Sequence, residues 1–403
     1  MPGTAAPVAP HERQPLIDAL RGLALAGVLM ANLGYLSLYD FTGDAARAAL
    51  PTAAFDLAVL KAMELLVSSK AITLFSLLFG LGFAIQLERA QARGAGGLRH
   101  YLQRLGWLLI IGLAHSYLIW WGDILTIYAV VGLLLVLFRH APDRWLLWGG
   151  LFIAVLLPGL IGPWLNSVID GESQRSSIYA RSLLAFVSDS WRDTFAANTA
   201  LVHWTRLMNW SLICFVLGRF LIGYWAGRRQ LLQRAEDHLP LLRRILIGAL
   251  AVAIVAGALL LLCNANPDWR EHMAGRLLRS TVFRLAPLAL AIAYAAGFVL
   301  LFQRAAWRRV LMGLALLGRM ALTNYLMQSV LGIFLFYGIG LGIGPWTGLT
   351  GWLLAWFGIL AAQIAFSHFW LARFRYGPCE WAWRSLTYGK LQPIRRPRVA
   401  LAS

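Results

Sequence analysis

The stretch GLAHSYLIWWGDILTIYAVVG, from Gly112 to Gly132, lies where two long apolar runs meet at a glycine. The first run covers 105–121 and ends in a pair of tryptophans, and the second covers 124–138. Paired tryptophans are typical of the interface between a membrane and water. The stretch therefore predicts two membrane helices joined by a tight turn, with Asp123 at its tip.

His115 lies inside the first of these apolar runs. At about 1.5 Å per residue it is about 16 Å from the start of the helix, near the middle of a hydrocarbon core of about 30 Å. An ionisable side chain at that depth is a functional hypothesis by default; the alternative is a histidine that packs by hydrogen-bonding a neighbouring helix. Asp123 is about 12 Å further along a continuous helix. The two side chains touch only if the chain folds back at Gly122, so the pattern alone does not predict a His–Asp pair.

The composition excludes an ordinary soluble domain. Of the 403 residues, 59% are hydrophobic and only 13% are charged, whereas an average soluble domain has about 25% charged residues. The apolar runs are long, unlike the short alternating segments of a membrane β-barrel. The predicted fold class is therefore all-α, a polytopic helical bundle in a membrane.

We count ten predicted spans of about twenty residues each. They are 17–38, 66–88, 104–121, 124–138, 144–163, 208–226, 244–263, 283–302, 320–342 and 350–371. The region 52–90 is too long for one span and contains charged residues. An interfacial or re-entrant piece is therefore expected before residue 66.

The distribution of charge predicts the topology. A net charge of +18 would suggest a nucleic-acid partner for a soluble chain, but here the arginines lie in short connections between apolar runs. Such connections face the cytoplasm. We therefore expect a membrane protein with both termini in the cytoplasm and no nucleic-acid partner. Residues 1–16 would form a cytoplasmic segment, 17–371 the bundle, with a long outer connection at 164–207, and 372–403 a basic cytoplasmic tail.

The first predicted span carries a polar stripe. Asp18 and Arg21 are three residues apart, and Asn32 follows Arg21 by eleven residues, or about three turns. All three therefore share one helix face, and charges within a span usually face the interior of the bundle. The stripe predicts a wall that binds an anionic or carbonyl-bearing substrate. The alternative is an ion pair that only orients the helix end.

Two further groups of polar residues lie near the C-terminal end. Asn324 and Gln328 share a face of the ninth span and either position a polar ligand or hold helices together. Arg373 and Arg375 either clamp a phosphate or face anionic lipid headgroups.

No metal or bound cofactor is expected. Cys214, Cys263 and Cys379 lie far apart without the paired spacing of a metal site or a disulfide framework. The sequence contains no P-loop, dinucleotide fingerprint, HExxH or GxSxG motif. These absences leave the intramembrane polar residues as the candidates for chemistry.

The chain resembles the YeiB-like family of bacterial inner-membrane proteins, the domain of unknown function 418, over nearly its whole length. The resemblance is carried by DALRGLALAGVLMAN near the start, LFSLLFGLGFAIQLERA from Leu74, the central GLAHSYLIWWGDILTIYAVVG, and GRMALTNYLMQS and GPCEWAWRSLTYGK near the end. The last two segments are the most specific. The family implies a multi-pass membrane protein but no established activity.

The first span also looks similar to that of a wider superfamily of transmembrane acyltransferases, which includes the lysosomal heparan glucosaminide N-acetyltransferase. This resemblance implies acyl-CoA on the cytoplasmic side as donor and a sugar-like acceptor on the far side. In one branch an arginine is followed eleven positions later by a catalytic histidine; here Arg21 matches the arginine, but Asn32 takes the place of the histidine. In the sugar N-acetyltransferase branch a histidine follows shortly downstream, whereas residues 33–65 contain none. The catalytic residue is therefore not carried over.

The leading hypothesis is transfer of an acyl group from acyl-CoA to a glycan or lipid acceptor of the cell envelope. His115 would be the general base, because an imidazole exchanges protons near neutral pH. Asn32 and Asn324 would stabilise the charge that develops on the thioester oxygen. Asp123 would orient the acceptor.

The CoA phosphates would be held by Arg21 with Arg373 and Arg375.

Two other hypotheses remain open. A permease for a small polar solute would use the same polar groups, although no pairing of the first five spans with the last five is evident. A scaffold or sensor subunit would use none of them, and the intramembrane histidine argues against it.

Overall fold

The computed structural model describes residues 14–92, 97–168, 172–270 and 272–396. This part of the chain is all-α, as predicted, and its strand-like pairing is a single bridge between Phe374 and Arg395. The α-helices are α1 Pro15–Leu36, α2 Asp44–Ala48, α3 Ala53–Leu66, α4 Lys70–Ala92, α5 Gly97–Leu118, α6 Leu125–Leu135, α7 Leu157–Val168, α8 Glu172–Val187, α9 Trp191–Met208, α10 Trp210–Arg228, α11 Leu239–Ala265, α12 Met273–Phe302, α13 Ala305–Arg319, α14 Ala321–Phe336, α15 Gly348–Arg373 and α16 Pro378–Tyr388. Short 3₁₀ turns are η2 Tyr39–Phe41, η3 Val136–Phe138, η6 Ala235–His238 and η7 Pro267–Arg270, and π-helical turns are η4 Trp145–Gly149 and η5 Phe152–Leu156.

Seven helical segments of the described chain are long and apolar enough to cross a membrane. They are Pro15–Leu36, Ala53–Glu88, Trp145–Val168, Trp210–Arg228, Ala235–Ala265, Met273–Phe302 and Gly348–Arg373. The pair α13–α14 would be an eighth, but it is bent by 80°. The other predicted spans correspond to α5 and the shorter apolar helix Leu125–Phe138. The protein is therefore a polytopic helical membrane protein.

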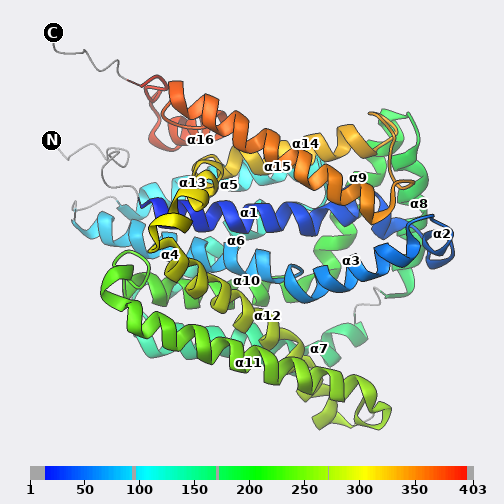
Figure 1. Cartoon of the computed structure of the whole chain (residues 1–403), viewed down its shortest axis with the longest axis horizontal. Helices are drawn as coiled ribbons and strands as arrows, with labels where there is room; N and C mark the ends of the chain where they lie inside the picture. The colour runs from blue at the N-terminus through cyan, green and yellow to red at the C-terminus, as the bar shows by residue number, and fades with distance from the viewer. Residues whose placement is uncertain (1–13, 93–96, 169–171, 271, 397–403) are drawn as a thin grey trace.

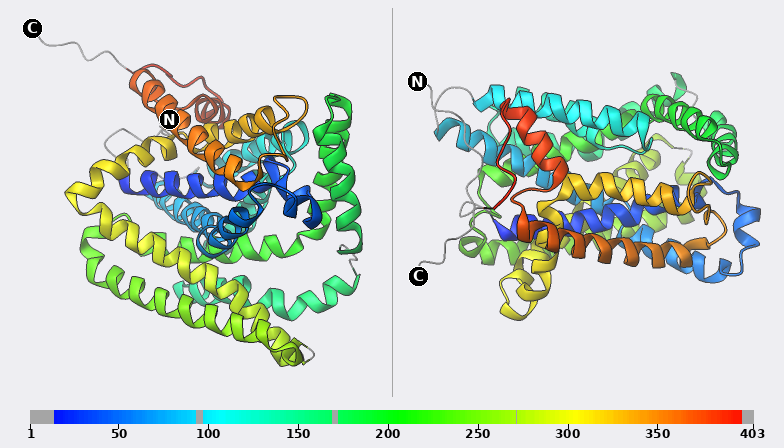
Figure 2. Two further views of the ribbon diagram at one scale, coloured as in Figure 1. Left: turned by 45° about the vertical axis from the view of Figure 1, so that its right-hand side comes forward. Right: turned by 90° about the horizontal axis from the view of Figure 1, so that it is seen from above.

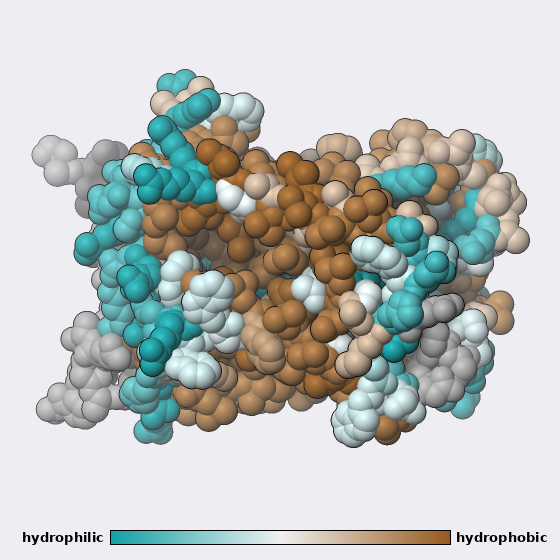
Figure 3. All heavy atoms as spheres, turned by 90° about the horizontal axis from the view of Figure 1, so that it is seen from below, coloured by the Kyte–Doolittle hydropathy of each residue, from teal (hydrophilic) through white to brown (hydrophobic). Residues whose placement is uncertain are grey.

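On the face drawn in Figure 3, an apolar band lies between two more hydrophilic ends. The described chain begins and ends at the same end of the bundle, where α16 also lies (Figure 1). We call this the basic end. At the opposite end, which we call the far end, lie α2, α8 and α9 (Figures 1 and 2). The pair α11–α12 packs side by side along one flank, with most of α11 exposed.

Glycines allow the central helices to approach closely. On α4 and α10, Gly80 and Gly223 each lie so near the facing backbone that a Cβ atom would collide with it. On α1 and α13, Gly22 and Gly318 make an equally tight pair. Small residues at such crossings are typical of membrane helices, where packing replaces the hydrophobic driving force. These contacts place α1 at the centre of the bundle.

Three acidic side chains cap the starts of helices inside the protein. Asp56 accepts a hydrogen bond from the amide of Leu349 at the start of α15 (3.0 Å). Glu380 accepts a hydrogen bond from the amide of Leu322 at the start of α14 (2.6 Å). Asp123 accepts one from the amide of Thr126 at the start of α6. The amide groups and the positive end of the helix dipole stabilise a buried carboxylate. Composition could not predict these partners, because two of the three are remote in sequence.

The described part of the predicted basic tail 372–403 contains α16, which packs against α5 and α14 (Figure 2). Within the predicted outer connection 164–207 lie the end of α7, all of α8 and nearly all of α9. A separate helix, α3, precedes residue 66, as predicted. The predicted segment 1–16 lies almost wholly outside the described residues.

Candidate functional site

A cavity of about 810 Å³ runs through the middle of the bundle. Its lining begins with arginines at the basic end, continues with apolar side chains such as Leu25 and Phe79, and reaches Asn32 and Arg206 toward the far end. Helices α1, α4, α5, α6, α9, α10, α14 and α16 all contribute to its wall. The cavity therefore offers one ligand charged contacts at one end and hydrogen-bonding groups at the other.

Five arginines line the basic end of this cavity. They are Arg21, Arg104, Arg319, Arg375 and Arg384. Arg104 lies over the ring of Trp383 at 4.2 Å and is close enough to Arg21 and Arg384 for their charges to repel. Asp18, 3.0 Å from Arg21, partly offsets this charge. A cluster of like charges in a cavity is a site for an anion with several charges.

Glu380 is the other carboxylate among the described residues that line the basic end. Burial raises the pKa of Glu380 above its usual value, against the opposing effect of hydrogen bonds from Thr323 and Leu322. Its oxygens accept from the Thr323 amide at 3.1 Å and from the Thr323 hydroxyl at 2.6 Å. Glu380 is therefore committed to holding the start of α14 rather than to neutralising the arginines.

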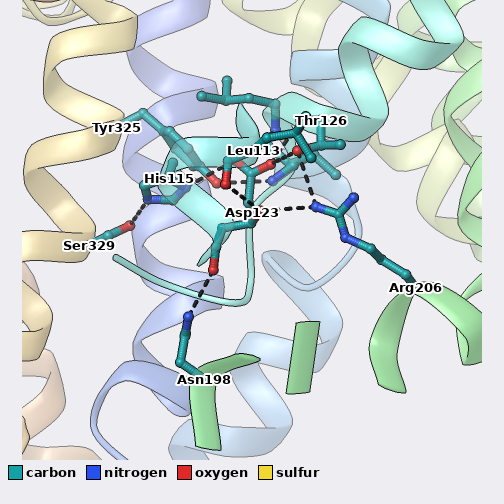
Figure 4. Close-up of polar contacts among 11 residues, drawn as sticks. Leu113, His115, Asp123, Thr126, Asn198, Arg206, Tyr325 and Ser329 are labelled. Atoms are coloured by element: carbon teal, nitrogen blue, oxygen red, sulfur yellow. Dashed lines mark hydrogen bonds and ion pairs between the residues drawn. The ribbon is translucent and has the colours of Figure 1, made fainter. Parts of the chain in front are cut away.

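His115 and Asp123 are in contact, which sequence spacing alone did not predict. Helix α5 ends at Leu118, and the chain turns back before α6 begins at Leu125. The turn brings His115 Nδ1 to 3.0 Å from Asp123 Oδ1 (Figure 4). The condition stated for contact, a chain that folds back at Gly122, is met. Trp120 in this turn is buried rather than at the membrane surface.

Asp123 accepts four hydrogen bonds in total. Besides His115, the donors are the amide of Leu125 at 3.1 Å and both the amide and the hydroxyl of Thr126, at 2.8 and 2.7 Å. These hydrogen bonds fix the orientation of the Asp123 side chain at the start of α6. When His115 Nδ1 donates to Asp123, the other ring nitrogen, Nε2, is an acceptor. Ser329 Oγ lies 3.0 Å from Nε2.

Of the buried pair, Asp123 lines the cavity, whereas His115 lies behind its wall. The side chains of His115 and Asp123 are 1% and 0% exposed. His115 and Ser329 do not line the cavity among the described residues, whereas Tyr325 and Thr126 do. Both ring nitrogens of His115 have partners within the protein, and the side chain does not face the cavity. Asp123 presents no free side-chain surface.

Thr126 connects this pair to the cavity. Its hydroxyl donates to Asp123 and lies 3.4 Å from Arg206 Nη2, a weak contact, while Arg206 donates more strongly to Ser116 at 3.0 Å (Figure 4). Arg206 comes from α9, which is held to the end of α5 by Asn198, a donor to the backbone carbonyl of Ser116 at 2.9 Å. Helix α9 thus fixes a cation opposite the turn between α5 and α6.

The polar stripe of the first span lies where the sequence predicts. Asp18, Arg21 and Asn32 all line the cavity. In the ninth span, by contrast, Asn324 and Gln328 are buried and turned toward α15. Asn324 Nδ2 donates to Ser367 Oγ at 3.1 Å, and Gln328 Nε2 donates to Gln363 Oε1 at 3.0 Å. The helix-holding alternative therefore describes these two amides.

The two tail arginines separate. Arg375 lines the cavity, but Arg373 is exposed at the end of α15 and reaches only the carbonyl of Phe369. Tyr325 and Thr126 were not predicted as site residues, although both lie in segments that carry the family resemblance. Arg104 and Arg206 were not predicted either, although each is an arginine that adjoins an apolar run.

Two comparisons identify relatives of the chain. Residues 226–390 match the family described as a protein of unknown function, DUF418. The chain is 30% identical to the uncharacterized protein YxaH of Bacillus subtilis, over 97% of this chain and 98% of the relative. It is 31% identical to the uncharacterized protein YeiB of Escherichia coli, over 93% of this chain and 96% of that one. No solved structure matches it. The chain belongs to the DUF418 family.

Proposed function

We propose that this member of the DUF418 family is an acyltransferase of the bacterial inner membrane that uses cytoplasmic acyl-CoA. One observation carries the proposal: a single cavity joins a cluster of five arginines to hydrogen-bonding groups near the opposite end of the bundle. We further propose a topology of ten spans with the basic end in the cytoplasm, because basic connections stay on that side. The arginine cluster then faces the compartment that contains CoA.

The donor would bind with its phosphates at the basic end. Arg21, Arg104 and Arg384 come from three separate helices and converge on the cavity. Guanidinium groups bind phosphate oxygens through paired hydrogen bonds. The ring of Trp383 adds a flat surface beside Arg104 for a base. The acyl chain would extend along the apolar middle of the cavity toward Asn32.

Proton transfer would run through Thr126. The acceptor O–H attacks the thioester carbon and gives its proton to Thr126 Oγ1, while the Thr126 proton passes to Asp123 Oδ2 over the 2.7 Å hydrogen bond. The carbon–sulfur bond breaks, the protons return along the same path, and the departing thiolate, which is more basic than a carboxylate, is protonated to free CoA. His115 would be a positioning residue that holds Asp123.

Charge on the thioester oxygen would be stabilised by groups that line the cavity. Asn32 keeps the role predicted from sequence, whereas Asn324 cannot fulfil it because its amide bonds α15. Arg206 takes its place as a donor near Thr126. Such fixed donors act strongly in a site from which water is excluded.

Binding of the donor tests the proposal first. Detergent-solubilised protein should gain thermal stability with CoA and acetyl-CoA in a saturable manner, because a ligand at a hundred times its Kd adds about 2.7 kcal/mol. Arg375→Ala should weaken the effect, and Arg373→Ala, two residues away but outside the cavity, should not. No shift with either ligand would contradict the proposal.

A permease is the second candidate, and one observation favours it. The central cavity and a second pocket at the far end share lining residues, so a solute has a path between them. Proteoliposomes distinguish the two functions. A permease moves a solute without acyl-CoA, whereas an acyltransferase consumes acyl-CoA and releases CoA.

A further inference from the structure

A second pocket of about 450 Å³ lies beyond the central cavity, at the far end of the bundle. Residues from the end of α1, the turn after α5, and helices α7 to α10 line it. The two hollows share Asn32, Tyr35, Trp121, Gly122, Thr205 and Asn209. A ligand in this outer pocket would therefore adjoin the turn that contains Asp123.

Aromatic rings form much of the wall of the outer pocket. Trp204 packs edge-on against Tyr179 with 5.8 Å between ring centroids, and Trp121 packs in the same way against Tyr35 at 5.3 Å. The ring nitrogen of Trp204 is buried and has no hydrogen-bond partner among the described residues. An indole combines a flat apolar face with one N–H donor. Such walls suit a ring that has apolar C–H faces and hydroxyl groups at its edge.

The polar groups of the wall are amides and one guanidinium. Asn32, Asn166 and Asn209 supply donors and acceptors, and Arg175 supplies a positive charge. No carboxylate side chain lines the pocket among the described residues. Asp40 does not line the pocket, but it is close enough to Arg175 for the two charges to interact. Burial raises the pKa of Asp40, while Arg47 and Arg175 lower it. The pocket is therefore biased against cations and toward anions.

We infer that the outer pocket is the acceptor subsite and that it takes a sugar ring with a negatively charged substituent. That the sugar is an acyl acceptor rests on the proposed function, but binding of the sugar to this pocket requires no acyl-CoA. The ring would lie against Trp204 and Trp121, and its charged group would meet Arg175. One ring hydroxyl would then face Asn32 and the shared wall, on the path to Thr126.

Three hexoses that differ in one substituent test the inference directly. Saturation-transfer NMR on the detergent-solubilised full chain compares D-glucuronate, D-glucose and D-glucosamine, which carry a carboxylate, a neutral group and an ammonium. Glucuronate should bind about tenfold more tightly than glucose, as one charge-assisted hydrogen bond allows. Glucosamine should bind more weakly than glucose.

Variants assign the binding to the pocket. Arg175→Gln should abolish the preference for glucuronate while glucose binding persists. Arg181→Gln is the matched control. Arg181 lies on the same helix and is exposed; among the described residues it bonds the Ser177 carbonyl of its own helix, and it does not line the pocket. Trp204→Leu should weaken the binding of all three sugars. Each variant must first show the wild-type melting temperature in detergent, and Arg175→Met, which also removes the charge, replaces Arg175→Gln if it does not.

The outcomes separate this inference from the proposed function. Equal binding of the three hexoses, binding unaffected by Arg175→Gln, or no binding by folded protein would overturn the subsite even if CoA stabilises the protein. Charge-selective binding without a CoA effect would support the subsite and contradict the acyltransferase. Octyl glucuronide distinguishes the source of the sugar: tighter binding than glucuronate indicates a lipid-linked acceptor, and equal binding a free one.

Discussion

His115 Nδ1 and Asp123 Oδ1 lie 3.0 Å apart in a region where both side chains are almost completely buried. The contact closes the turn between α5 and α6 and leaves Thr126 as the link from the pair to the cavity. A buried polar side chain needs hydrogen bonds to offset the loss of water. Asp123 has four donors, so the pair is stable without a ligand. This arrangement makes Thr126 the side chain whose substitution is most informative.

We expect Thr126→Val to reduce acyl transfer by roughly 10²-fold or more, the usual range for loss of a proton-transfer group. Valine keeps the shape but removes the hydroxyl between the cavity and Asp123. Thr126→Ser restores the hydroxyl and should restore most of the rate. The measurement is CoA release from acetyl-CoA in membranes, with CoA binding as the control. Equal rates in the two variants would argue against the proton path.

The N-terminal cap of α14 gives a pH-dependent prediction. Burial raises the pKa of Glu380 above its ordinary value of 4.5, so the folded protein binds this proton more tightly than the unfolded chain. The resulting stability is complete below the ordinary pKa and is lost as pH rises through the raised pKa. Melting temperatures should therefore fall across this window for the wild type and less for Glu380→Gln. Glu236→Gln, on an exposed residue, should keep the wild-type slope; identical slopes in all three would contradict the prediction.

The amides between α14 and α15 should contribute stability and not activity. Gln363 donates to the Asn324 carbonyl at 2.8 Å and accepts from Gln328 at 3.0 Å. Gln363→Leu should lower the free energy of unfolding by about 1 kcal/mol, the scale of interhelical hydrogen bonds in membranes. Affinity for CoA should stay unchanged. Unfolding in mixed detergents measures the free energy of unfolding. A variant of normal stability that binds CoA much more weakly would show that these amides belong to the binding site.

The arginine cluster predicts a strong dependence on ligand charge. CoA should bind about tenfold more tightly than dephospho-CoA, which lacks one phosphate, because a charge-assisted hydrogen bond is worth roughly 1.5–3 kcal/mol. Added salt should reduce the difference through screening. Arg384→Ala should reduce the difference in affinity between CoA and dephospho-CoA, whereas Arg373→Ala should not. Calorimetry with the two ligands is the measurement, and equal affinities would place the phosphates elsewhere.

Sequence periodicity was most reliable within a single helix. The common face of Asp18, Arg21 and Asn32 follows from helix geometry and is present in the cavity. It could not give the rotation of a helix within the bundle. On α14, Tyr325 faces the cavity while its neighbour Asn324 faces α15, because the packing of α15 and α16 sets that rotation.

Contacts that depend on a turn or a helix end were beyond the sequence. Gly122 predicts a turn but not its geometry; His115 and Asp123 meet because α5 ends at Leu118, inside the apolar run that was predicted to continue to Trp121. Arg373 and Arg375 separate because α15 ends at Arg373, which turns the next residues toward the cavity. Both cases are decided by where a helix stops rather than by which residues it contains.

Acyl transfer with a fixed sidedness is the central claim, and membrane vesicles of known orientation test it most directly. Radiolabelled acetyl-CoA, which does not cross membranes, is added outside vesicles from cells that overproduce the protein. Inside-out vesicles, formed so that they enclose periplasmic extract, expose the arginine cluster to the label. The account predicts labelled acceptor in these vesicles, little in right-side-out vesicles, and loss of labelling with Thr126→Val. Labelling that is equal in both orientations, or absent although CoA stabilises the protein, would contradict it.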